Sequence, residues 1–205
     1  MASEHIYKQF DSDLEAIRAK VLEMGTLVEE QTANAVKSLL NTDIKLAEEV
    51  MKRDVQINDL EVAIDEETSL LIAKRSPAAG DLRNIMMMLK IITDLERMGD
   101  EAAKIARSTT RIFEDNRMSK PRFTEIKGMA KAVQGMIKTA LNSFARLDLS
   151  DTIDILEKDK QVDDDYRSCM RQLLTFMLED PRTISMSLES MFIAKSLERI
   201  GDHAV

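Results

Sequence analysis

The sequence predicts an all-α protein built from two tandem three-helix bundles, and three observations carry this prediction. The 205 residues include only 6 glycines and 3 prolines, which leaves few turns and favours long helices. Apolar residues recur at steps of three and four over long stretches. The second half of the chain also repeats the order of features in the first, so each half is expected to form one bundle.

The first bundle is expected at residues 1–117 and the second at residues 118–205, joined by a polar linker near residues 114–121. Helices are predicted over residues 5–40, 44–75 and 81–113 in the first half. The second of these ends before Ser76-Pro77, because proline lacks the amide that a helix interior needs. In the second half a helix over residues 122–147 is followed by one capped by Ser150 and one starting at Asp180-Pro181. Asp81 is the expected cap of the third helix.

Composition excludes several classes of function. A net charge of −8 and a pI near 5 argue against nucleic-acid binding by phosphate neutralisation. Cys169 is the one cysteine, so a disulfide framework is excluded and a reducing compartment is expected. The first ten residues lack the apolar core of a signal peptide, and no apolar stretch approaches the length of a membrane span. We therefore expect a cytoplasmic protein without membrane insertion, which partners could recruit to the inner face of the membrane.

One hexapeptide motif occurs twice. Leu-Glu-Arg-Met-Gly-Asp at residues 95–100 returns as Leu-Glu-Arg-Ile-Gly-Asp at residues 197–202. In each copy a glutamate and an aspartate stand four residues apart, so they share one face of a helix. Two such carboxylates repel each other unless a cation lies near them. The motif therefore predicts a site that holds a cation.

The middle helix of each half carries a matching pair, and the two pairs stand 105 positions apart. If the last helix of each bundle folds back on the middle one, the pairs face each other. Such a cluster of oxygen ligands suits magnesium, manganese, calcium or iron, and zinc less readily. The neutral Asn58 makes the first site less charged than the second. The candidate ligands are Asp54, Asn58, Glu96 and Asp100 in the first half, and Asp159, Asp163, Glu198 and Asp202 in the second.

These motifs, with the run from Lys74-Arg75-Ser76-Pro77 to Asp81-Leu82-Arg83, resemble the PhoU family over essentially the whole chain. The resemblance implies two similar bundles that bind iron, zinc or manganese through their acidic motifs. It further implies a regulator without enzymatic turnover, which links the ATPase subunit of a phosphate ABC transporter to a phosphate-sensing histidine kinase. Such a regulator represses the phosphate-starvation response when phosphate is plentiful, and it commonly forms homodimers. Family members continue the last helix, so the second bundle is expected to be truncated at Val205.

Two alternatives remain open from the residues. A metal-dependent enzyme of the ferritin-like kind would use Glu-x-x-His pairs, but neither histidine, His5 or His203, stands in that spacing. A purely structural helical adaptor would leave the acidic pairs inert as solvated helix faces. Metal content and partner binding separate these alternatives from the regulator.

Overall fold

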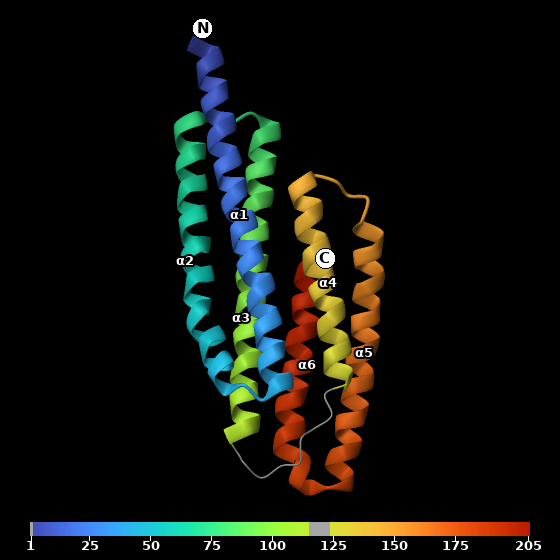
Figure 1. The fold of residues 1–205 in the computed structure, drawn as a ribbon. Coiled ribbons are helices and arrows are strands. Elements are labelled where there is room, and N and C mark those ends of the chain that lie inside the picture. The colour runs from blue at the N-terminus through green and yellow to red at the C-terminus, as the bar shows by residue number, and fades with distance from the viewer. Residues whose placement is uncertain (1, 115–123) are drawn as a thin grey trace.

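Long helices make up nearly all of the protein, as predicted (Figure 1). This computed structural model describes residues 2–114 and 124–205. The first bundle consists of α1, α2 and α3, the second of α4, α5 and α6, and α3 lies beside α6 between them. The bounds are α1 Ala2–Asn41, α2 Ile44–Arg75, α3 Ala79–Glu114, α4 Thr124–Arg146, α5 Thr152–Glu179, the 3₁₀ helix η1 Pro181–Thr183, and α6 Ile184–Ala204.

The predicted apolar stripes form the bundle cores. α2 carries apolar residues at seven-residue intervals, namely Val50, Ile57, Ile64 and Leu71, and all four are buried. In α5 the repeat is buried at Ile155, Val162 and Cys169, but Phe176 is 45% exposed. A seven-residue repeat drifts around a straight helix, and near the end of α5 the buried position belongs to Leu173 instead.

Some predicted helix starts were wrong. Asp81 lies inside α3, which begins at Ala79. Asp151, not Ser150, is the residue before α5, and the Ser150 hydroxyl instead donates a hydrogen bond to Asp148 at 2.8 Å. The expected start of the fourth helix at residue 122 and the linker at residues 115–121 lie outside the described residues, as does the predicted domain boundary at 117/118, which stays a prediction.

Equivalent helices end in the same way in the two bundles. Asp43 caps α2 through the amide of Leu46, at 3.0 Å. Thr42 and Leu147 follow α1 and α4, and both have a left-handed backbone, with φ of 59° and 52°. At each of these ends, the amide of the left-handed residue and the amide after it donate to carbonyls of the last helical turn, in the Schellman pattern. For example, the amide of Asp43 donates to the carbonyl of Ser38 at 2.8 Å. α1 and α4 therefore end with the same Schellman motif at equivalent positions of the two bundles.

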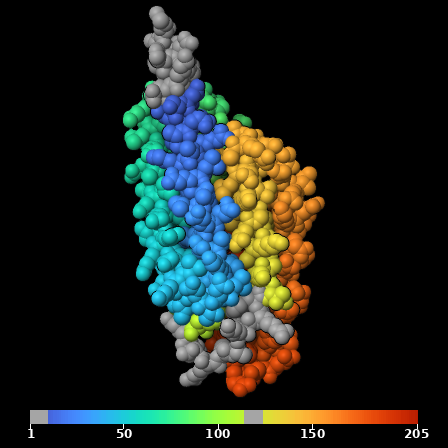
Figure 2. Space-filling model, in the orientation of Figure 1, coloured from blue at the N-terminus to red at the C-terminus, as the bar shows by residue number. Residues whose placement is uncertain are grey.

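Two layers of contact join the bundles. On the face seen in Figure 2, α1 lies beside α4, where Gly25 receives the side chain of Leu141. A Cβ at residue 25 would stand 2.3 Å from Leu141 Cδ2, so only glycine leaves room for Leu141 in this position. Arg18 also reaches across, since its guanidinium donates to the carbonyl of Phe144 at 3.0 Å. These contacts tie the end of α4 to the middle of α1.

The second layer is the contact between α3 and α6. The Glu101 carboxylate is 5% exposed and accepts hydrogen bonds from Ser196 at 2.7 Å and from Arg199 at 3.0 Å. His203 Nδ1 lies 3.0 Å from Asp94 Oδ1. Counting from the repeated motif, Asp94 of α3 corresponds to Ser196 of α6, and Glu101 corresponds to His203. The Glu101–Ser196 and His203–Asp94 contacts therefore join the same pair of positions, with the roles of α3 and α6 exchanged. The carboxylate that Arg199 contacts, that of Glu101, thus belongs to the other bundle.

No helix within residues 2–114 and 124–205 combines the length and the apolar character needed to cross a bilayer.

Candidate metal centres

The second bundle holds the denser acidic cluster. Carboxylate oxygens of Asp163, Glu198 and Asp202 lie within 4.8 Å of one another, and Asp159 stands one helical turn before Asp163 on α5. Burial raises the pKa of Asp159, and the charges of Asp163 and Glu198 raise it further. All four residues predicted for the second site are therefore placed together.

The same forces act on the end of the motif. Burial raises the pKa of Asp202, and the charge of Asp159 adds to this, while Lys195 opposes it. Lys195 also donates to Glu198 at 2.7 Å, which gives this glutamate an ion pair within its own helix. Burial first, and then the neighbouring carboxylates, raise the pKa values of Asp159 and Asp202, so the second cluster is short of positive charge. This donor set fits a hard or borderline cation.

The first bundle brings together Asp54 of α2 with Glu96 and Asp100 of α3. Burial raises the pKa of Glu96, and the charges of Asp100, Glu61 and Asp54 raise it further. Burial also raises the pKa of Asp54, a hydrogen bond from Gln31 opposes this, and the charge of Asp100 adds to the rise. The predicted pairing of α2 with α3 is therefore reproduced as a cluster of mutually repelling carboxylates.

Asn58 differs from its counterpart in the second site. Its side chain is exposed, whereas its counterpart Asp163 is partly buried within the second cluster. Glu61, the next acidic residue along α2, is close enough to Glu96 to raise its pKa. Its seven-residue spacing from Asp54 was the available signal, because that spacing returns a side chain to nearly the same helix face. The first bundle therefore brings together the carboxylates of Asp54, Glu96 and Asp100, with Glu61 nearby.

Sequence reasoning also missed Gln31, which comes from α1. Its side-chain amide donates to Asp54 Oδ1 at 2.8 Å and to the carbonyl of Gly99 at 3.2 Å. Gly99 lets α2 approach closely, because a Cβ there would lie 3.0 Å from Ile57 Cδ1 and 3.3 Å from Asp54 Oδ1. A single glutamine in a helical pattern carries no signal for this contact, which only the packing of three helices creates.

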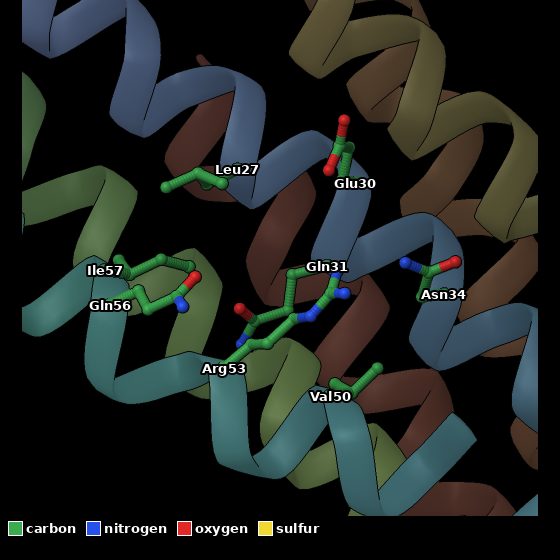
Figure 3. Close-up of a pocket in the computed structure, with 8 residues that line it drawn as sticks. All are labelled: Leu27, Glu30, Gln31, Asn34, Val50, Arg53, Gln56 and Ile57. Carbon is green, nitrogen blue, oxygen red and sulfur yellow. The ribbon is translucent and has the colours of Figure 1, made fainter. Parts of the chain in front are cut away.

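Figure 3 shows Gln31 at the edge of a small cavity between α1 and α2, with Arg53 across from it. The cavity has a volume of about 20 Å³. This is room for about one water molecule. Its lining residues are Leu27, Glu30, Gln31, Asn34, Val50, Arg53, Gln56 and Ile57. The cavity is therefore too small to bind a ligand larger than a water molecule.

The fold and the two sites define the class of protein. It is an all-helical protein of two repeated three-helix bundles, each with a cluster of carboxylates contributed by two helices. The PhoU domain matches twice, at residues 21–109 and 126–205. A PhoU homologue described as a phosphate-specific transport system accessory protein, from Pseudomonas aeruginosa, is 44% identical over 203 residues, which cover 98% of this chain and 83% of the relative. The Escherichia coli K12 protein of that description is 41% identical over 200 residues, covering 98% of this chain and 82% of the relative.

Solved structures agree with this. The crystal structure of PhoU from Pseudomonas aeruginosa matches with a TM-score of 0.91 and 44% identity, over 95% of this chain and 93% of that one. The phosphate transport system regulatory protein PhoU from Streptococcus pneumoniae matches with a TM-score of 0.86 and 28% identity, over 95% and 91% of the two chains. The chain belongs to the PhoU family.

Proposed function

We propose that this chain is an accessory and regulatory protein of a phosphate transport system. Membership of the PhoU family is the observation that carries this proposal, because the relatives are described as accessory proteins of phosphate-specific transport. The chain acts in the cytoplasm without enzymatic turnover. It docks on the ATPase subunit of a phosphate ABC transporter and on a phosphate-sensing histidine kinase, and it restrains the starvation response when phosphate is plentiful.

Metal binding is part of the same proposal. Iron, manganese, zinc or magnesium binds to carboxylates from α2 and α3 in the first centre and from α5 and α6 in the second. The crowded carboxylates of each centre support this, since a bound cation would offset their mutual repulsion. A cation held between two helices fixes one against the other. At a free metal concentration of 100 times Kd, this stabilises a bundle by about 2.7 kcal/mol.

Co-purification tests the partner proposal. The tagged chain is expected to retain the transporter ATPase subunit and the histidine kinase from cells grown in high phosphate, with the tag alone as control. Size-exclusion chromatography with light scattering checks the proposed homodimer in the same preparations. Absence of both partners in high and in low phosphate contradicts the regulatory role.

Metal analysis of protein purified without chelator tests the second centre. Combined Glu198→Gln and Asp202→Asn substitutions are expected to lower the metal content, because both remove a charged ligand. Asp164→Asn is the control, since Asp164 is an exposed acidic residue of α5, the helix that faces Glu198 and Asp202, but is not part of the cluster. An unchanged metal content in the double variant contradicts metal binding at this centre and favours the metal-free adaptor.

A further inference from the structure

Gln31 is a polar side chain that α1 inserts beside the first centre. It is 5% exposed, and its Nε2 donates both to Asp54 Oδ1 at 2.8 Å and to the Gly99 carbonyl at 3.2 Å. An amide nitrogen carries two hydrogens, so these two bonds use both. The amide therefore links all three helices of the first bundle at the point where Asp54 meets the motif of α3.

No equivalent donor is found in the second bundle among residues 124–205, the part of it that the structure describes. Counting back from Thr42 and Leu147, the left-handed residues that end α1 and α4, Gln31 corresponds to Met136. The contacts agree, because Met136 Cε would lie 3.7 Å from a Cβ at Gly201, the counterpart of Gly99. A methionine side chain has no hydrogen to donate. Asp159, the counterpart of Asp54, therefore lacks the partner that Asp54 has.

We propose that Gln31 is a positioning residue of the first metal centre, which orients the Asp54 carboxylate toward Glu96 and Asp100. This inference rests on the proposed metal binding. A hydrogen bond from a neutral amide limits the rotation of the Asp54 carboxylate, so that its oxygens keep one orientation. The first centre thus compensates for its neutral Asn58 by fixing Asp54, whereas the second depends on the number of its charges.

The test uses Mn²⁺ binding to the whole chain, with one centre disabled at a time. Asp202→Asn leaves the first centre, and Asp100→Asn leaves the second. The free Mn²⁺ signal in electron paramagnetic resonance gives Kd in each background. Gln31→Met, which copies Met136 and keeps a similar volume, is expected to weaken binding at the first centre about ten-fold or more. Binding at the second centre is expected to change less than about two-fold, because Gln31 touches only the first.

A general effect on folding has a different outcome. Equal weakening in both backgrounds, or no weakening in the first, overturns the role of Gln31 while Mn²⁺ binding itself stands. Gln31→Leu gives a second variant that has lost the donor without adding a charge, and it is also expected to weaken the first centre. If Mn²⁺ binds to neither background, metal binding at both centres is overturned together with the role of Gln31.

Discussion

Cys169 shows how strongly a single position of the core can change the chemistry of a side chain. It is 4% exposed within the apolar stripe of α5. Burial, with a smaller effect from the charge of Glu125, raises the pKa of its thiol from 9.0 to about 11. The thiolate is the reactive form of cysteine, so this residue is a core side chain rather than a nucleophile.

We predict that native protein reacts only slowly with iodoacetamide at neutral pH, and that unfolding in urea makes the reaction complete. The sign of the pH dependence follows from the raised pKa. Between pH 9.0 and about 11 the unfolded thiol ionises and the folded one does not, so stability falls as pH rises through this window. Mass spectrometry of the alkylated chain measures the reaction, with Cys169→Ser as control. Rapid labelling of the native chain would contradict the buried placement.

At the scale of elements, the sequence predicted helices best where a chemical signal marks both ends. The bounds of α2 agree with the prediction, because Asp43 caps its start and Ser76-Pro77 blocks its continuation. The starts of α3 and α5 were missed, since Asp81 and Ser150 are good capping residues by type but neither occupies the cap position. Residue type alone does not say which of several polar residues the backbone places at a helix start.

The left-handed end of α1 gives a prediction at this scale. A left-handed backbone costs an ordinary residue about 1–2 kcal/mol, and Thr42 is also branched at Cβ. Thr42→Gly is therefore expected to raise the free energy of unfolding by about 1 kcal/mol, after allowance for the flexibility of glycine in the unfolded chain. Thr26→Gly, within the exposed face of α1, is the control and should lower it by about 0.3 kcal/mol, the difference between threonine and glycine in a helix interior. Urea unfolding measures both, and a destabilising Thr42→Gly would contradict the Schellman ending.

At the scale of the whole molecule, the buried Glu101 joins the two bundles. Burial alone would raise its pKa, but hydrogen bonds from Ser196, Lys104 and Arg199 together hold the pKa below its usual value. The internal repeat predicted the two bundles, and the acidic pairs predicted which carboxylates lie close together in each bundle. The contact between α3 and α6 could not be predicted, because no local pattern states which bundle faces meet. From the sequence alone, Glu101 cannot be distinguished from a solvent-exposed acidic residue.

Arg199→Ala tests this contact. It leaves the Glu101 carboxylate buried with fewer donors, and hydrogen bonds to charged groups are worth about 1.5–3 kcal/mol. Because Arg199 is itself half exposed, we expect a loss of stability nearer the lower value, measured by urea unfolding in chelator. Lys158→Ala, which breaks an exposed ion pair with Asp154, is the control and should change stability by about 0.5 kcal/mol or less. Equal effects of the two substitutions would contradict an inter-bundle role for Arg199.

The reciprocal contacts between α3 and α6 have a consequence for how the two halves associate. A surface that pairs with its own copy by a two-fold relation is isologous, the arrangement of a symmetric dimer. Here both copies belong to one polypeptide, so their association is intramolecular and occurs at a high effective concentration. Covalent fusion thus relieves the interface of the affinity that separate subunits would need. It can be built around ionic and polar pairs such as Glu101 with Arg199 and Asp94 with His203, instead of the continuous apolar surface of an obligate dimer.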